Sequence, residues 1–254
     1  MDERRILAVA AARVVRLGRE ARTLAEVDPK QEVRERIWGL LERERAARFP
    51  GARGRIPNFS GAELAAGRLA ELPEWRAARV VKANPDAPQL PVRRRAREDR
   101  KTLYMAVPRL ADEKPFVAVR GDPTIRRALA EGRHIGLEEL EPVDLVVCGT
   151  VAVNREGVRI GKGGGFSDLE FALLAERGLV GAETTIATTV HQLQLLDEKL
   201  PETEHDFRVD VIVTPSAMVR TQRRRRPSGL LWDHLNAEKR AAVPVLGALG
   251  PGMR

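Results

Sequence analysis

Residues 144–172 read DLVVCGTVAVNREGVRIGKGGGFSDLEFA. The segment opens with an apolar run at residues 145–148, which predicts a buried strand. A glycine-dense loop follows at residues 161–165, and an apolar helical pattern begins at Leu169. Glycines let backbone N–H groups approach an anion, and a helix N-terminus adds partial positive charge. The order of strand, glycine loop and helix therefore predicts a site for phosphate.

Charged residues flank this loop. Arg159 and Lys162 are placed to neutralise phosphate oxygens, and Asp168 is placed to hold a divalent cation beside them. Two plainer interpretations stay open. The glycines can form a simple flexible turn, and Asp168 can be the N-cap of the helix that starts near Leu169. The loop is not a Walker A motif, because no Gly-Lys-Ser/Thr closes it.

A second pair of cations lies near the start of the chain. Lys30 and Arg34 are four residues apart in a predicted helix from residue 30 to about residue 48, so they share a face. We expect this face to be exposed. Two cations on one face can grip a polyphosphate, with arginine binding in forked geometry. The alternative is an ordinary solvated helix edge.

Short apolar runs alternate with helical patterns along the chain, which predicts an α/β fold with a mostly parallel sheet. Ser60, followed by Glu63, predicts a capping box that opens a helix to about residue 72. The strand near residues 80–81 leads into a proline-rich stretch, residues 84–91, predicted to be a rigid loop. Ligands bind where strands end, so Asn84, Asp86 and Gln89 are candidate pocket residues.

The 254 residues suggest one main domain with extensions. We expect an N-terminal helical extension at residues 1–27, an α/β domain at 28–220 and a basic C-terminal extension at 221–254, packed on the same domain. In that extension, the apolar residues from Leu230 and at 244–246 predict a helix and a strand.

Composition narrows the class of protein. No apolar run is long enough to predict a membrane span, and the single cysteine, Cys148, favours the reducing cytoplasm. A net charge of +8 suits nucleic acid or small anions alike. Aromatic residues make up only 4% of the chain, and no stacking motif is evident, so nucleic acid is not the expected partner. No Cys/His cluster predicts zinc, and the sequence does not predict the oligomeric state.

Residues 159–168, RIGKGGGFSD, resemble the signature Arg-Leu-Gly-x-Gly-x-Gly-Tyr-Tyr-Asp of the 5-formyltetrahydrofolate cyclo-ligase family. Lys30 and Arg34 match a Lys-x-x-x-Arg pattern near the start of family members. A late His/Asn-Asp-x-x-Val-Asp pattern of the family is matched by residues 205–210. The three matches occur in the family's order.

The resemblance implies a three-layer Rossmann-like, CoA transferase-like fold, with helices on both faces of the sheet. It implies an ATP- and Mg²⁺-dependent enzyme that phosphorylates the formyl oxygen of 5-formyltetrahydrofolate and forms 5,10-methenyltetrahydrofolate. ATP is then expected at Lys30, Arg34, Arg159, Gly161, Lys162, Gly163, Gly164, Gly165, Phe166 and Ser167. Mg²⁺ is expected at Asp168 and Asp206, and the reduced folate at Gln89, Tyr104, Gly165 and Phe166.

The chain also departs from the family pattern. Ser167 replaces the second tyrosine of the signature, and Gln89 occupies the position of a pterin-binding glutamate. Cys148 and Gly149 stand where the family has a Pro-Gly-x-x-Phe-Asp segment. Two alternatives therefore stay open. One is an ATP-binding paralogue that acts on another carboxylate or amide, and the other is a basic RNA-binding protein on the same fold.

Overall fold

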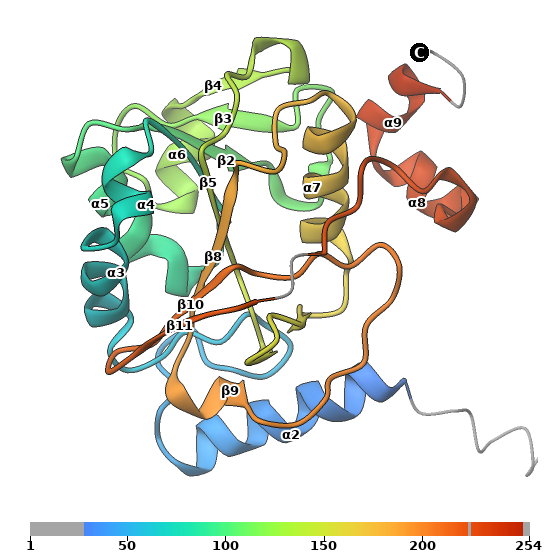
Figure 1. Ribbon diagram of the computed structural model, residues 1–254. Coiled ribbons are helices and arrows are strands. Elements are labelled where there is room, and N and C mark those ends of the chain that lie inside the picture. Colours follow the sequence, from blue (N-terminus) through green and yellow to red (C-terminus); the bar gives the residue numbers. More distant parts are fainter. Residues whose placement is uncertain (1–27, 223–224, 251–254) are drawn as a thin grey trace, which may run out of the picture.

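The computed structural model describes residues 28–222 and 225–250 (Figure 1). The N-terminal extension predicted at residues 1–27 lies outside the described residues. An eight-stranded sheet with the order β11-β10-β8-β5-β1-β2-β3-β4 forms the centre of the protein. Its strands are β1 (Val80–Ala83), β2 (Thr102–Ala106), β3 (Phe116–Ala118), β4 (Arg133–Ile135), β5 (Leu145–Cys148), β8 (Thr185–Thr189), β10 (Val211–Val213) and β11 (Met218–Arg220).

The central strands β10, β8, β5, β1 and β2 run parallel, while β11, β3 and the outermost β4 pair antiparallel with their neighbours. In the central register, Lys82 of β1 lies between Tyr104 of β2 and Val146 of β5. All four residues of β5 are buried, which explains why its sequence is a continuous apolar run without polar alternation. The predicted mostly parallel α/β sheet is confirmed.

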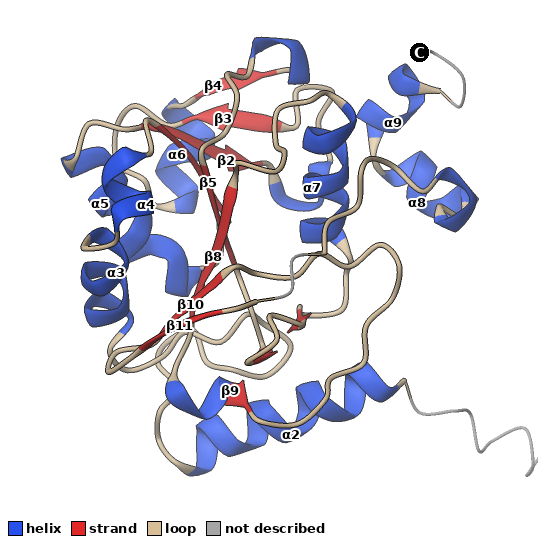
Figure 2. Ribbon diagram, in the orientation of Figure 1, coloured by secondary structure: helices blue, strands red, loops and turns tan. Residues whose placement is uncertain are grey.

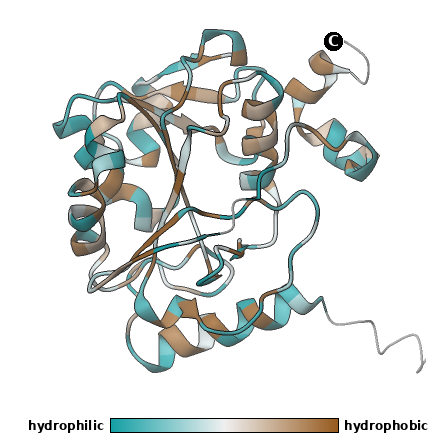
Figure 3. Ribbon diagram, viewed as in Figure 1, coloured by the Kyte–Doolittle hydropathy of each residue, from teal (hydrophilic) through white to brown (hydrophobic). Residues whose placement is uncertain are grey.

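Helices cover both faces of this sheet, so the domain has three layers (Figure 2). One face packs against α3 (Ala62–Ala70), α4 (Pro73–Ala77), α5 (Leu90–Glu98) and α6 (Ile125–Glu131). The other face packs against α7 (Phe166–Glu176) and α9 (Pro244–Leu249), and α8 (Ala237–Ala242) precedes α9. Figure 3 shows that these helices carry hydrophobic and hydrophilic residues side by side, as expected for helices with one buried face.

A small second sheet lies beside the main one. Its order is β7-β6-β9, formed by β6 (Ala152–Asn154), β7 (Arg159–Ile160) and β9 (Leu195–Leu196). Helix α2 (Pro29–Arg43) packs Val33, Ile37 and Leu41 against this sheet in a separate apolar cluster. Asp28 caps the helix by accepting a hydrogen bond from the Lys30 backbone N–H at 3.0 Å. The helix thus has a fixed start close to its predicted position, although it ends at Arg43, before residue 48.

Two local predictions were wrong. Gly61, with a left-handed φ of 89°, is the N-cap of α3, and no side chain caps that helix. The Ser60 hydroxyl instead accepts a hydrogen bond from Arg48, so the predicted capping box does not form. The stretch at residues 84–91 is not a loop throughout: a short 3₁₀ turn leads directly into α5, where Pro91 occupies the first turn. Proline is tolerated there because first-turn N–H groups have no intrahelical partner.

The C-terminal segment also differs from the prediction. Residues 244–246 form the first half of helix α9, where a strand was expected. Pro244 starts this helix, and Val245, Leu246 and Leu249 are buried in the core that contains α7. An apolar run of this length does not by itself distinguish a strand from a buried helix. None of the helices in the described part of the chain combines the length and apolar character needed to cross a bilayer.

Candidate functional site at the glycine loop

The glycine loop connects β7 to α7. Gly163 and Gly165 have φ values of 108° and 66°, in the left-handed region that side chains other than glycine rarely adopt. None of the described residues accepts a hydrogen bond from the backbone N–H groups of residues 162–168. A run of consecutive unpaired N–H groups at the start of a helix is a concave donor surface for an anion.

Arg159 lies beneath the loop. Its side chain is 1% exposed. It donates from Nη2 to Asp168 Oδ1 at 2.8 Å and from Nη1 to the Gly149 carbonyl at 3.1 Å. The guanidinium carbon also lies 4.5 Å from the centre of the Phe207 ring. Asp168 occupies the first turn of α7, whose N-cap is Gly165. The alternative of Asp168 as N-cap is therefore wrong, and its carboxylate faces Arg159.

The two predicted cations of α2 bind different partners, and Arg34 is the one that contacts the glycine loop. Arg34 donates from Nε to the Gly161 carbonyl at 2.8 Å. Lys30 Nζ lies 2.5 Å from Asp206 Oδ2, so residues 176 positions apart in the sequence form one ion pair. The expectation of an exposed face fails for Arg34, which is only 6% exposed. Because α2 packs against the small sheet, the Arg34 guanidinium contacts the loop from the side of that sheet.

Asp206 is held ionised by its neighbours. Burial disfavours its charge, but hydrogen bonds from Lys30 and from the Thr203 backbone N–H outweigh that cost, and the pKa of Asp206 is lowered. The Thr203 N–H donates to Asp206 Oδ2 at 2.6 Å. Asp168 and Asp206 both act on the buried Arg159, and their charges favour its protonated form. The two carboxylates predicted to bind metal therefore share one electrostatic environment.

Magnesium fits this donor set in part. In the described chain, no group of three or more His, Cys, Asp or Glu side chains is close enough to form a complete metal cage. Mg²⁺ does not need such a cage, since it keeps several waters and binds through one or two carboxylates and substrate phosphates. Asp168 and Asp206 each use one oxygen in a short contact to a cation, which leaves a second oxygen for a metal.

Polar residues at the end of β1 extend the site. Lys162 Nζ lies 2.9 Å from Asp86 Oδ1, and Asn84 Nδ2 donates to Ser167 Oγ at 3.1 Å. Asn84 Oδ1 in turn accepts from Lys82 Nζ at 2.7 Å, and Lys82 forms an ion pair with Glu170. The glycine loop and the first turns of α7 are thus tied to β1 by side chains.

Lys82 and Glu170 were not among the site residues predicted from the sequence. Both are buried, with exposed fractions of 2% and 5%. The available signal was a charge within each apolar run: Lys82 follows Val80 and Val81, and Glu170 lies between Leu169 and Phe171. Charges are almost never fully buried unless they are paired, so such positions predict a partner.

Gln89 and Tyr104, two of the four residues predicted to face the folate, lie in different places. Gln89 is fully buried, donates from Nε2 to Thr189 Oγ1 at 3.3 Å, and its Oε1 has no partner among the described residues. An unpaired buried oxygen is costly and is available to a donor group. The Tyr104 hydroxyl lies near Glu141, at 3.3 Å from its Oε1. Tyr104 therefore has its contacts away from the glycine loop.

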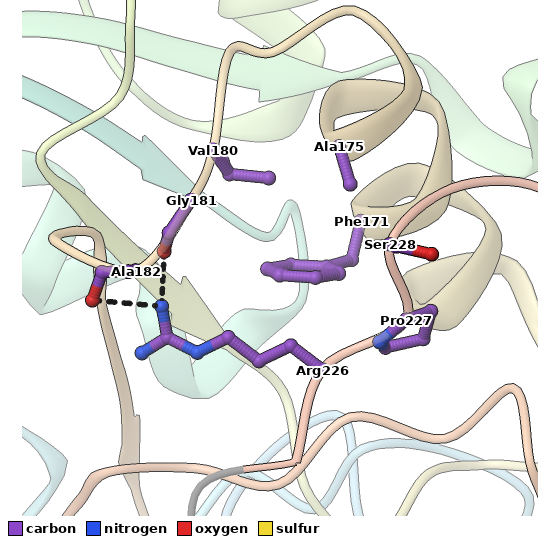
Figure 4. A pocket seen from close by; sticks show the side chains of 8 residues that line it. All are labelled: Phe171, Ala175, Val180, Gly181, Ala182, Arg226, Pro227 and Ser228. Atoms are coloured by element: carbon purple, nitrogen blue, oxygen red, sulfur yellow. Dashed lines mark hydrogen bonds between the residues drawn. The ribbon is translucent and has the colours of Figure 1, made fainter.

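A cavity of about 470 Å³ lies elsewhere, between α7 and the chain at residues 226–228 (Figure 4). Phe171 and Val180 form apolar parts of its wall, and Arg226 points across it to the Gly181 and Ala182 carbonyls. Arg226 also pairs with Asp210 Oδ2 at 2.5 Å. None of the predicted site residues lines this cavity. The candidate site is the open glycine loop, and the cavity is a separate feature.

Comparisons with known proteins find relatives over most of the chain. The profile of the 5-formyltetrahydrofolate cyclo-ligase family matches residues 26–215. Methenyltetrahydrofolate synthase domain-containing protein from Mus musculus is 40% identical over 85% of this chain and 62% of its own length. The protein of the same name from Homo sapiens is 38% identical over 87% of this chain and 61% of its own length. The chain thus spans about three fifths of the curated relatives that it matches.

A solved structure supports the fold. The Aquifex aeolicus 5,10-methenyltetrahydrofolate synthetase superposes with a TM-score of 0.51 at 20% sequence identity. The match covers 78% of this chain and 93% of that one. At this identity the likeness concerns the arrangement of strands and helices.

Proposed function

The chain belongs to the 5-formyltetrahydrofolate cyclo-ligase family, and we propose that it is an ATP- and Mg²⁺-dependent enzyme that converts 5-formyltetrahydrofolate to 5,10-methenyltetrahydrofolate. The observation that carries the proposal is the run of unpaired N–H groups at residues 162–168, set among cations from α2 and β7. This arrangement supports binding of a polyphosphate.

In this proposal, the loop N–H groups hold the phosphates, and Lys30 and Lys162 supply charge at the rim. Lys162 is the more adaptable of the two, because its side chain is 49% exposed and has Asp86 as its one ion-pair partner among the described residues. Arg159 and Arg34 act from beneath by fixing Asp168 and the Gly161 carbonyl. Phosphoryl transfer depends on such positioning and charge neutralisation more than on a nucleophilic side chain.

Asp168 and Asp206 would hold Mg²⁺, which supplies charge neutralisation on the phosphates when bound. The remaining chemistry occurs between the substrates. The formyl oxygen attacks the γ-phosphorus of ATP, and ADP leaves. N10 then attacks the activated formyl carbon, its proton is lost, and inorganic phosphate leaves with the former formyl oxygen. The products are 5,10-methenyltetrahydrofolate, ADP and phosphate.

Gln89 is the proposed contact of the folate ring. Its unpaired Oε1 can accept a substrate N–H, while its Nε2 is already committed to Thr189. A glutamine accepts a substrate donor less strongly than an ionised glutamate does, since only the carboxylate carries a charge. We therefore expect turnover of this substrate to be limited at this contact.

The test is formation of 5,10-methenyltetrahydrofolate by the purified protein, followed by its absorbance, with Mg-ATP and saturating 5-formyltetrahydrofolate. Formation of methenyl product that requires both the protein and Mg-ATP supports the folate step, whereas turnover of about 1 per second or faster, an ordinary enzymatic rate, contradicts the limit expected at Gln89. ATP binding measured by calorimetry without any methenyl product contradicts the folate step. A panel of other carboxylates and amides, assayed for ATP hydrolysis, then identifies the compound that is activated.

We also propose that the enzyme acts in the reducing cytoplasm. Cys148 is fully buried, and burial raises the pKa of its thiol, so it behaves as a small apolar side chain and does not require an oxidising compartment. Fractionation of cells that express the full-length protein tests this location.

A further inference from the structure

The C-terminal segment, residues 230–250, reaches the glycine loop from far along the sequence. Its apolar residues Leu230, Val243 and Leu246 are buried in the core that contains α7. Figure 1 shows α8 and α9 beside α7, on the side away from the sheet. This anchoring fixes α8 next to the start of α7, where the loop ends.

Lys239 of α8 makes the contact. Its Nζ donates to the Gly164 carbonyl at 2.5 Å and lies 3.6 Å from the centre of the Phe166 ring. The backbone of Lys239 is fixed as well, because its N–H donates to Asn236 Oδ1, the N-cap of α8, at 2.7 Å. Burial lowers the pKa of Lys239, which indicates that the ammonium group is partly removed from water.

The loop is therefore held by cations on two sides. Arg34 of α2 binds the Gly161 carbonyl at 2.8 Å, and Lys239 of α8 binds the Gly164 carbonyl at 2.5 Å. In a planar trans peptide, the C=O of one residue and the N–H of the next point in opposite directions. With the Gly164 carbonyl turned toward Lys239, the Gly165 N–H points away from it. The same geometry turns the Lys162 N–H away from Arg34.

We propose that Lys239 is a positioning residue of the glycine loop, which holds the Gly164–Gly165 peptide so that its N–H faces a bound phosphate-bearing anion. The identity of the anion as ATP rests on the proposed function, whereas the orientation of the peptide does not. The C-terminal extension is then part of the binding site and not a detached tail. Lys239 acts through the loop and need not touch the phosphates.

The test compares the wild type with Lys239→Met, which keeps an unbranched apolar stem and removes the ammonium. Backbone amide NMR shifts of Gly163, Gly164 and Gly165 report the orientation of the loop. Calorimetry with Mg-ATP reports its consequence, and we expect about tenfold weaker binding, as for loss of one charge-assisted hydrogen bond. Lys239→Arg keeps a cation at this position and should recover part of the affinity.

Lys114→Met is the matched control, because Lys114 is an exposed lysine paired with Glu139, outside the glycine-loop site. Unchanged glycine amide shifts in folded Lys239→Met overturn the proposal, even if ATP binding weakens, because the lysine would then act by charge alone. If the wild type does not bind Mg-ATP, the proposed function fails, and the amide shifts still decide the positioning role. Asn236→Ala is a second variant, because it removes the N-cap of α8 and keeps Lys239. The same glycine amide shifts are measured in it.

Discussion

The glycine loop presents backbone N–H donors that have no partner among the described residues, whereas the polar side chains at the end of β1 are mostly buried and paired with one another. At the loop, Arg34 and Lys239 bind carbonyls and leave N–H groups open. At β1, Lys82 is bound by both Glu170 and Asn84. We call these two regions the loop half and the β1 half of the site.

The difference indicates a division of roles. Backbone N–H groups are the same whatever the side chain, so the loop half suits a group that many substrates share, such as phosphate. The β1 half is made of side chains in fixed mutual contacts, and Gln89 adds one unpaired acceptor. Recognition by buried polar groups discriminates strongly between substrates, because a mismatch leaves a group unpaired. The β1 half is therefore where we expect the second substrate to be selected.

The largest expected effect concerns the β1 half. Lys82→Met removes one partner of a buried ion pair and leaves Glu170 uncompensated, so it should lower the free energy of unfolding by about 3–5 kcal/mol. Lys82→Met combined with Glu170→Met should recover most of that loss, since well-packed apolar replacements of a buried pair are often neutral. Urea denaturation measures both variants.

The control is again Lys114→Met, whose exposed pair with Glu139 should be worth at most about 1 kcal/mol. A similarly small cost for Lys82→Met would mean that the β1 half is hydrated and open. The contrast between the two halves would then disappear.

The second effect concerns the loop half. Gly163→Val places a β-branched residue at a φ of 108°, and the nearest side-chain atoms to an added Cβ, from Arg34, lie at 3.6 Å. The obstacle is therefore the backbone conformation, with strain of about 1–3 kcal/mol, and relaxation would move the N–H donors. We expect at least about 100-fold weaker ATP binding by calorimetry.

Gly67→Val is the comparison for that variant, because Gly67 lies on the exposed side of α3 with no atom within 4 Å of an added Cβ. It should leave ATP binding unchanged. Wild-type affinity in folded Gly163→Val would show that the loop N–H groups do not hold the phosphates.

A smaller effect is expected for the cations of α2. Lys30→Ala should raise the KM for ATP by about 10- to 100-fold, since one charge-assisted contact contributes about 1.5–3 kcal/mol. Arg34→Ala should weaken ATP binding and also lower the free energy of unfolding, because Arg34 is buried against the loop. Steady-state kinetics and denaturation measure the two quantities.

Arg36→Ala provides the control on the same helix, since Arg36 is exposed and pairs with Glu198. An unchanged KM for ATP in Lys30→Ala and Arg34→Ala would make this helix face purely structural.

The smallest expected effect is on the pKa of Asp206. Burial raises the pKa of this carboxyl, but the hydrogen bonds from Lys30 and Thr203 outweigh burial and lower it. The stability that comes from this lowered pKa is present above the ordinary aspartate value, about 3.9, and is lost as the pH falls through the folded-state value. In NMR titrations, the Asp206 midpoint should lie below the ordinary value and move upward in Lys30→Met. A midpoint that does not move would mean that the ion pair is not formed in solution.

The sequence by itself determined the local elements of the loop half. The apolar run of β5, the glycines at 161–165 and the helical pattern after them predicted strand, loop and helix, and the structure has all three elements. The strand that leads into the loop is β7, however, because the unpredicted strands β6 and β7 of the small sheet lie between β5 and the glycines. Such patterns are readable because they depend on neighbours within a few residues, through burial periodicity and allowed backbone angles. The four-residue spacing of Lys30 and Arg34, which places both on one face of a helix, is also a local pattern of this kind.

Only the tertiary structure decided which charges meet. Lys30 joins Asp206, Lys82 joins Glu170 and Lys239 joins Gly164, and each pair is separated by 75 residues or more. Helix ends also depended on tertiary contacts, since Gly61 and Gly165 cap α3 and α7 where Ser60 and Asp168 were the candidates. A charged residue shows in the sequence that it needs a partner when buried, but the partner is chosen by how the sheet, α2 and the C-terminal helices pack around the loop.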